Sequence, residues 1–379
     1  MDPQQLNAAQ RKLVLQQSVK MKQNIFSATV NPANGNVVNI VPRNVGLILR
    51  FIVEVTANYT DVAAGTTALT DFGVLNVISN IQFTDLQNNQ RHNTYGLHLG
   101  LTSSFKEQQP FAAAYTPSQE QGNFGPNWNI VGATAPTTTV VGSSKTVYEV
   151  PIAYSDDDLR GAIYANVVAN QMQLALTINP TPGPATGDDT FSVFYGAGAG
   201  DTTTISTVVI NVYQEYLDQL PVGPSGVVLP VLDISTVYQL LYSNFTNIAP
   251  GQDYYIQYTN FRRYLAATIV YNNSGTRGGR GVGADINYWA QVSSNFTNIW
   301  KVDPFEQARI TRRVLRSDPP PGTYYFGSRK QPIYTLTYGN MQLDLNPITA
   351  GASAYALVLW EFMALQNTLS SSGSLPANG

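Results

Sequence analysis

Four arginines are predicted to lie on one face of a short helix that begins after Asp303. An Asp-Pro pair is a typical helix start, because the aspartate caps free backbone amides and proline fits the first helical position. The spacing i, i+3, i+4, i+7 places on one side Arg309, Arg312, Arg313 and Arg316. Ile310 and Leu315 belong to the opposite arc, which can pack on a β-core. The arginine face is either solvated or a contact with another subunit, since arginine is the preferred cation at interfaces. It is the candidate subunit interface.

A second basic group lies near the N-terminus. No acidic residue occurs from Pro3 to Val53, whereas the whole chain has a net charge of -3. The sequence predicts a basic arm over residues 1–40, whose candidate functional residues are Arg11, Lys12, Lys20 and Lys22. The apolar residues of its first part scatter around a helical wheel, so the arm is a poor amphipathic membrane helix. We expect it to need something outside the fold to order it.

Two histidines and one acidic run are the other groups that could bind a metal. His92 and His98 are six residues apart. This spacing does not place them on one face of a helix, whereas an i, i+4 spacing would. The run Asp156-Asp157-Asp158 offers calcium ligands, but after Ser155 it is better explained as the acidic first turn of a short helix. The chain has no cysteine. We therefore expect no catalytic residue, no metal site and no cofactor.

Two further segments imitate known binding motifs. Gly142–Thr146 resembles the end of a phosphate-binding loop, but it lacks the upstream glycine and leads into a predicted strand. The run from Arg277 to Gly283 resembles one RGG segment, and a mobile surface loop is the better interpretation. Neither segment therefore predicts a phosphate or nucleic-acid site.

The composition favours a folded protein that packs against other subunits. Hydrophobic residues make up 43% of the 379 residues, and charged residues only 12% against about 25% in ordinary soluble proteins. Desolvating neutral amides and hydroxyls costs less than desolvating ions, so a surface with few charges suits large interfaces. The sequence pI of about 5.4 argues against a dedicated nucleic-acid binder. No run is long and apolar enough for a transmembrane helix or a secretion signal.

The elements that would position these groups are mainly strands. Short alternating or β-branched runs between Gly, Pro, Asn and Asp predict an all-β sandwich or barrel. The runs are Val45–Thr56, Asn76–Thr84, Thr146–Pro151, Met172–Asn179, Thr207–Tyr216, Tyr254–Tyr258, Leu265–Tyr271, Ile333–Tyr338 and Ala354–Phe362. Short helices are expected to begin at Asp2, Ser155 and Asp303.

A weak internal repeat suggests two units. Met172–Leu176 comes shortly before Asn179-Pro180, and a similar stretch, Met341–Leu345, comes directly before Asn346-Pro347. Between the halves, Leu220–Gly226 has the proline and glycine content of a linker.

Together, several longer motifs carry a family resemblance. They occur in order along the chain: Ala68–Gly73, Asn89–His92, Pro151–Ser155, Tyr216–Gly223, Leu229-Pro230, Asp233–Thr236, Asp285–Tyr288, Asp303-Pro304 with Arg312-Arg313, and Pro332–Asn340. In these motifs the sequence resembles the major capsid proteins of tectiviruses, the tailless icosahedral phages with an internal membrane. The sequence departs from the family pattern around Pro180–Thr203, in Arg277–Gly283 and in the tail after Leu365.

The resemblance implies an all-β fold of two side-by-side jelly rolls (a double jelly roll), with a few short helices and extended arms. The expected division is a basic arm over 1–40, a first jelly roll over 41–219, a linker over 220–230, a second jelly roll over 231–365 and a tail over 366–379. Three such chains would form a pseudo-hexagonal capsomer, a homotrimer, of an icosahedral shell around a membrane and a double-stranded DNA genome.

The resemblance also implies the partners. They are neighbouring capsid trimers, minor capsid and vertex proteins, and the lipids of the internal membrane, with no sequence-specific nucleic-acid contact and with assembly in the host cytoplasm. The basic arm would then lie on the inner face of the shell against anionic head groups, or it would clamp adjacent trimers. The alternative function is a β-sandwich receptor-binding spike or lectin; a glycoside hydrolase is weaker, because no carboxylate pair stands out.

Overall fold

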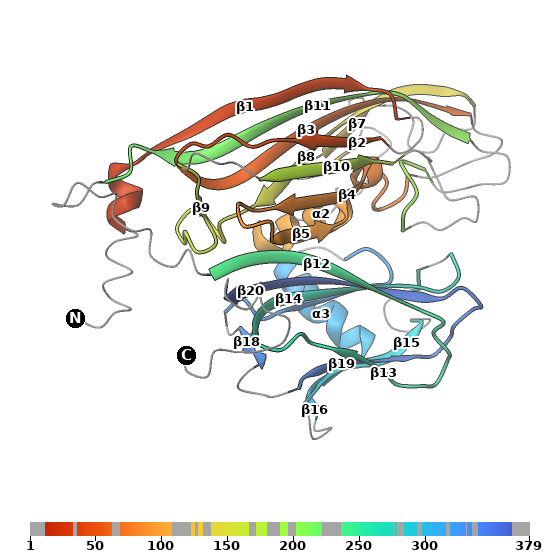
Figure 1. The fold of residues 1–379 in the computed structure, drawn as a ribbon. Coiled ribbons are helices and arrows are strands. Elements are labelled where there is room, and N and C mark those ends of the chain that lie inside the picture. Colours follow the sequence, from red (N-terminus) through yellow and green to blue (C-terminus); the bar gives the residue numbers. More distant parts are fainter. Residues whose placement is uncertain are drawn as a thin grey trace, which may run out of the picture.

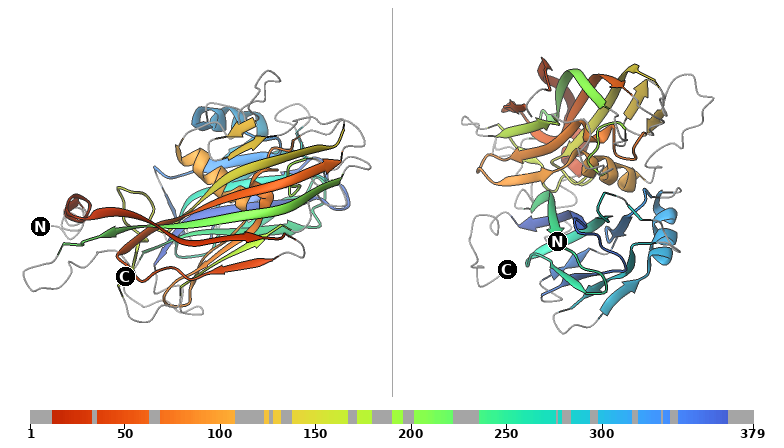
Figure 2. Two further views of the ribbon diagram at one scale, coloured as in Figure 1. Left: turned by 90° about the horizontal axis from the view of Figure 1, so that it is seen from above. Right: turned by 90° about the vertical axis from the view of Figure 1, so that its right-hand side faces the viewer.

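The computed structural model is built mainly from β-strands. The residues it describes are 12–32, 36–62, 69–107, 123–125, 128–131, 138–166, 172–179, 190–195, 202–221, 236–275, 277–278, 284–293, 298–315, 319–330, 332–335 and 340–365. Two β-units lie side by side, the first formed by residues up to 221 and the second by residues from 236 onward (Figure 1, Figure 2). Within these ranges, no helix has the length and hydropathy needed to span a membrane.

The first unit contains a seven-stranded sheet with one face on a core. Its order is β1 (Val19–Val30), β11 (Thr202–Asp218), β3 (Leu47–Val62), β8 (Val140–Pro151), β7 (Trp128–Val131) and β6 (Asn123–Gly125), with β9 (Ile163–Tyr164) beside β3. Alternate residues of β3 from Phe51 to Tyr59 are buried, as expected when one face of a strand packs on a core.

A nine-stranded sheet runs through both units. Its order is β17 (Thr323–Gly327), β14 (Arg262–Asn272), β20 (Tyr355–Leu365), β12 (Thr236–Thr246), β5 (Gln90–Thr94), β4 (Ile78–Thr84), β10 (Gln173–Ile178) and β2 (Val37–Ile40), with β18 (Ile333–Tyr334) beside β14. The units meet where β12 pairs in parallel with β5, through Leu240 opposite His92 and Leu241 opposite Asn93. We call this junction of β5 and β12, with the side chains packed around it, the seam.

The second unit is closed by a four-stranded sheet. Its order is β13 (Tyr254–Gln257), β19 (Gln342–Pro347), β15 (Ile286–Val292) and β16 (Asn298–Val302). Helical segments among the described residues include 12–17, η1 (Leu75–Val77), α2 (Gly96–Glu107) and α3 (Pro304–Leu315). One buried apolar cluster fills the first unit and continues across the seam, and a second cluster lies inside the second unit around Trp289.

Strand β1 corrects the expectation of an arm outside the fold. It runs antiparallel to β11 from Val19, opposite Asp218, to Val30, opposite Val208. Hydrogen bonds to β11 therefore order the backbone of this edge strand without a partner from outside. Most of its side chains are exposed, which is why the segment shows no apolar stripe in the sequence. Strand β2, also inside the expected arm, pairs with β10.

The other expected elements have mixed outcomes. The nine predicted strand segments overlap β3, β4, β8, β10, β11, β13, β14, β18 and β20, although β18 has only two residues. The helix after Asp303 is confirmed as α3, and the one at Asp2 lies outside the described residues. The helix after Ser155 is wrong: the Asp158 amide donates to Ser155 Oγ at 3.0 Å, but the chain turns at Gly161, whose φ of +89° favours glycine.

Candidate functional site

Helix α3 presents its arginines to solvent. The Glu306 amide donates to Asp303 Oδ1 at 2.9 Å, so the expected cap is formed. The buried face is Pro304, Gln307, Thr311 and Leu315, spaced by three or four residues. Gln307 was not expected in the core; its amide nitrogen donates to the carbonyl of Tyr325 in β17 and so ties the helix to the sheet.

The exposed face of α3 carries three of the four candidate interface residues. Arg309, Arg312 and Arg313 are exposed, and Arg316 lies outside the described residues. Arg309 is held by Glu306, with Nε 2.8 Å from Oε2, and this bond lowers the pKa of the Glu306 carboxyl. Apolar side chains adjoin this face along the chain: Phe305 is 68% exposed, and Trp300 and Ile299 on the edge strand β16 are each 44% exposed. The face therefore combines arginine with aromatic groups, a composition enriched at protein interfaces.

The N-terminal candidate residues are anchored to the first unit. Residues 12–17 are helical, and Val14, only 2% exposed, packs in a small cluster with Leu47, Leu49 and Leu217. Lys12 is exposed on this anchored helix, and Arg11 lies outside the described residues. The helix, the start of β1 and the end of β20 lie at the same end of the molecule (Figure 1). We call this end the base.

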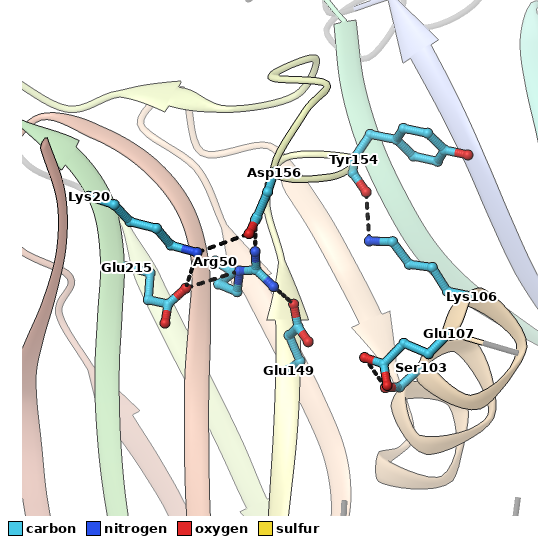
Figure 3. Close-up of polar contacts among 9 residues, drawn as sticks. All are labelled: Lys20, Arg50, Ser103, Lys106, Glu107, Glu149, Tyr154, Asp156 and Glu215. Atoms are coloured by element: carbon cyan, nitrogen blue, oxygen red, sulfur yellow. Dashed lines mark hydrogen bonds and ion pairs between the residues drawn. The ribbon is translucent and has the colours of Figure 1, made fainter. Parts of the chain in front are cut away.

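Lys20 and Lys22 already have partners within the chain. The Lys20 ammonium lies 2.9 Å from Asp156 Oδ2 and 3.3 Å from Glu215 Oε2 (Figure 3). The Lys22 ammonium lies 4.5 Å from the ring centroid of Tyr213, a cation–π contact on the neighbouring strand. The structure thus separates the four predicted arm residues: Lys12 is displayed, whereas Lys20 and Lys22 help to hold β1 on β11.

An ion network surrounds Arg50 beside a cavity of about 170 Å³ (Figure 3). Its guanidinium contacts Glu149 and Asp156, and its Nε lies 3.2 Å from Glu215 Oε2. The cavity lies between the first unit and β12, and its lining includes Arg50, Leu99, Lys106, Glu149 and Tyr238. Sequence reasoning missed this network, because its members come from β1, β3, β8, β11 and the loop after β8, and no local spacing connects them.

The polar groups of the cavity are used in structural contacts. Lys106 donates to the carbonyl oxygen of Tyr154 at 2.7 Å, and burial lowers the pKa of its ammonium. Ser103 Oγ donates weakly to a carboxylate oxygen of Glu107, at 3.4 Å, within the last turns of α2. These contacts tie α2 to the loop after β8 and to itself.

The two histidines are buried within the core. Leu240 donates its amide to His92 Nδ1 at 3.1 Å, so the protonated Nε2 donates to the carbonyl of Pro151 at 2.6 Å. His98 Nδ1 and Thr94 Oγ1 share a hydrogen bond of 2.5 Å. Burial lowers the pKa of both imidazoles to about 3. The interpretation as core histidines is confirmed, and His92 connects β5, β8 and β12 at the seam.

The acidic run and the arginine-rich run have specific partners. Asp156 binds Arg50 and Lys20, and Asp158 binds Arg160 with Oδ2 2.7 Å from Nε. In the described chain, no group of three or more His, Asp or Glu side chains lies close enough to hold a metal ion. Arg277 is not a free loop residue: it lies 3.0 Å from Asp71 and 4.5 Å from the ring centroid of Phe72, both in the first unit. Residues 279–283 lie outside the described residues.

Comparison with protein families gives matches over nearly the whole chain. The model for the N-terminal part of the P3 major capsid protein matches residues 3–220, and the model for its C-terminal part matches residues 235–377. The major capsid protein P3 of Enterobacteria phage PRD1 is 37% identical over 376 residues, which cover 97% of this chain and 93% of that protein.

Solved structures show the same arrangement of strands. The major capsid protein of Sulfolobus turreted icosahedral virus superposes with a TM-score of 0.64 at 11% identity, covering 94% of this chain and all of that chain. The major capsid protein P2 of bacteriophage PM2 gives a TM-score of 0.50 at 11% identity, over 94% of this chain and all of that chain. At these identities the likeness shows the fold alone. The expected double jelly roll is confirmed.

Proposed function

The chain belongs to the P3 major capsid protein family, and on that basis we propose that three copies join into one pseudo-hexagonal capsomer. As a major capsid protein it is a structural component of the virion and lies in the capsid shell. The spike or lectin alternative is therefore set aside. The observation that supports the trimer is the pair of jelly rolls side by side in each chain (Figure 2), since three copies present six similar units around one axis.

The proposed contact between copies is the exposed face of α3. Phe305 and Trp300 supply apolar area that is exposed in the single chain, and Arg309, Arg312 and Arg313 can pair with carboxylates of the next copy. An aromatic centre rimmed by arginines is the composition of residues that contribute most to binding energy at interfaces. The expected second jelly roll over 231–365 is kept as part of this proposal, whereas the first jelly roll, expected over 41–219, is extended to include β1 and β2, which pair with β11 and β10.

The base of the molecule is proposed to face the internal membrane of the virion. Lys12 is exposed there on an anchored helix, and Arg11 precedes it directly. Neighbouring trimers, minor capsid proteins and vertex proteins are the other proposed partners. The genome is enclosed without sequence-specific contact, assembly takes place in the host cytoplasm, and the protein has no catalytic role. The competing possibility is that the N-terminal segment clamps adjacent trimers.

The mass of the soluble protein tests the trimer. Light scattering should report about 124 kDa, three times the 41.3 kDa of one chain. Because the chain has no cysteine, a reducing agent should leave this mass unchanged. A stable monomer at micromolar concentration would contradict the proposal.

A further inference from the structure

The outer face of the four-stranded sheet holds two carboxylates from distant parts of the chain. Asp344 lies in β19 between Leu343 and Leu345, whose side chains point into the core, so Asp344 points to the outer face. Tyr255 of β13 lies opposite Asp344, and Asp253 lies two residues before Tyr255, on the same face. The two carboxylates therefore approach each other on one surface although 91 residues separate them in the sequence.

Asp253 takes the hydrogen-bond donors that lie beside the pair. Tyr288 of β15 donates its phenolic proton to Asp253 Oδ1 at 2.6 Å. Asn346 also donates to Asp253 Oδ1, again at 2.6 Å. A phenol has one proton, so it cannot satisfy both acids at once. Asp253 takes the available donors, and Asp344 is left short of one.

Asp344 is the uncompensated member of the pair. The residue is only 4% exposed, and its Oδ1 atom has no hydrogen-bond partner in the described part of the chain. A buried carboxylate oxygen without a partner destabilises the fold, because its desolvation is not compensated. Burial and the neighbouring Asp253 raise the pKa of Asp344 to about 6, which is the expected result of placing two acids together.

The nearest cation does not fill this gap. Lys301 of β16 places its ammonium 3.5 Å from the ring centroid of Tyr288, over the aromatic face, and it makes no ion pair with either carboxylate among the described residues. Its positive charge lowers the pKa of Asp344, but less than burial and the charge of Asp253 raise it. Asp253 is exposed, so solvent reaches the pair from its side.

We propose that Asp344 and Asp253 form a site for one hard divalent cation, of the calcium type, on the outer face of the second jelly roll. The donors present are oxygens: two carboxylates and the Tyr288 hydroxyl, with water completing the shell. A site with only two carboxylates, one exposed and one buried, is expected to be weak, with a dissociation constant of about 10⁻⁴ to 10⁻³ M. This departs from the expectation of no metal site, which considered the two histidines, the absence of cysteine and the run at Asp156. The proposal is independent of the trimer.

Terbium luminescence tests the site directly. Tb³⁺ replaces Ca²⁺ and is excited by energy transfer from nearby tyrosines, and here Tyr255 and Tyr288 adjoin the carboxylates. The full-length protein should give sensitised emission that saturates with Tb³⁺ and that Ca²⁺ displaces. Asp344→Asn and Asp253→Asn should each weaken binding about tenfold or more, equal to about 1.4 kcal/mol. Lys301→Gln should tighten it about threefold by removing the competing charge.

Two controls make the outcome decisive. Asp157→Asn removes one charge from the other acidic run, whose members Asp156 and Asp158 are already paired with cations, and it should leave the emission unchanged. Tyr288→Phe should reduce the affinity while the protein keeps its urea midpoint within a few tenths of a molar. An unchanged Tb³⁺ affinity in Asp344→Asn, or a lower affinity in Asp157→Asn, would overturn the proposal whatever the oligomeric state of the protein.

Discussion

Arg329, near the seam, and Arg313, on α3, both carry a guanidinium group, but the first binds a buried carboxylate and the second is exposed. Arg329 Nε lies 3.2 Å from Glu361 Oε1, its Nη1 donates to the Tyr325 hydroxyl at 2.7 Å, and Tyr238 donates to the same carboxylate at 2.9 Å. Glu361 is almost completely buried, and Arg313 is exposed. Arg329 thus neutralises a buried carboxylate inside the second unit, next to β12, whereas Arg313 lies on the exposed face of α3.

The largest expected difference between these two arginines is in the free energy of unfolding, and Arg329→Met tests it. The substitution leaves the Glu361 carboxylate buried without a cation, so the free energy of unfolding should fall by about 3–5 kcal/mol. Arg313→Met should change it by no more than about 0.5 kcal/mol. Urea denaturation of both variants measures the contrast.

A double variant distinguishes charge from packing in this prediction. Arg329→Met combined with Glu361→Leu removes both ions and should recover most of the lost stability, because well-packed apolar residues replace a buried pair at little cost. Equal losses for Arg329→Met and Arg313→Met would show that the buried Glu361 does not depend on Arg329 for its place in the fold.

Acid should weaken the seam through its histidines. Burial lowers the pKa of His92 and His98 to about 3, below the value of about 6.5 in an unfolded chain. The unfolded chain therefore binds more protons below pH 6.5, and the stability present above that pH is lost as the pH falls toward 3. Each histidine contributes a slope of up to about 1.4 kcal/mol per pH unit.

The His92→Asn variant isolates this contribution. Between pH 6 and pH 4.5, its unfolding free energy should fall less steeply than that of the parent by about 1.4 kcal/mol per unit. Denaturant titrations at several pH values give both slopes. Parallel slopes would mean that His92 is already protonated in the folded protein, and the contacts with Leu240 and Pro151 would need another explanation.

The same contrast explains what could be predicted from the sequence. Helix α3 has a cap, a Pro and a regular spacing within twelve residues, so its exposed face could be deduced from local pattern. The other contacts join residues that are far apart in sequence: Lys20 meets Asp156 within the first unit, and Arg277 meets Asp71 and His92 meets Leu240 between the units. Only the folded chain brings such pairs together. The two carboxylates Asp253 and Asp344, proposed to bind a cation, are also far apart in sequence.

Helix α2 and strand β1 were not predicted from the sequence, for a different physical reason. Ten residues of α2, from Gly96 to Phe105, are buried, so this helix lacks the polar face that gives an amphipathic period. Strand β1 shows the opposite condition, because its mostly exposed side chains leave no buried alternation. Pattern therefore fails where an element is buried on all sides or has no buried side. Family resemblance supplied the double jelly roll that local pattern alone left as a sandwich or barrel.

A smaller effect, on association only, is expected from reversing charges on α3. Arg312→Glu with Arg313→Glu would repel any acidic partner, at about 1–3 kcal/mol per desolvated contact. Light scattering should show a shift toward monomer, while the urea midpoint stays close to that of the parent. Lys330→Glu reverses an exposed charge elsewhere in the second unit and should keep the trimer. An intact trimer in the double reversal would mean that the arginines of α3 are solvated in the assembly.

The smallest effect per chain is expected at the base, where the exposed cations are proposed to contact lipid. Removing residues 1–11 leaves β1, Lys20 and Lys22 in place, so we expect the fold to be preserved. A deletion through Gln23 would remove the first five residues of β1 and the Lys20 ion pairs. Each basic residue near an anionic surface contributes about 1 kcal/mol, so Arg11 and Lys12 together supply about 2 kcal/mol.

Contact with lipid can therefore be detected only in the assembled protein. One arm binds weakly, but three arms of a trimer act together and strengthen binding through multivalency. The trimer should float with vesicles that contain anionic lipid at low salt and detach near roughly 0.5 M salt, where charges are screened within a few ångströms. Removing residues 1–11 together with Lys12→Gln should abolish flotation, whereas Lys145→Gln, an exposed lysine of β8, should not. Equal flotation of the shortened protein would leave clamping of adjacent trimers as the better account of the N-terminal segment.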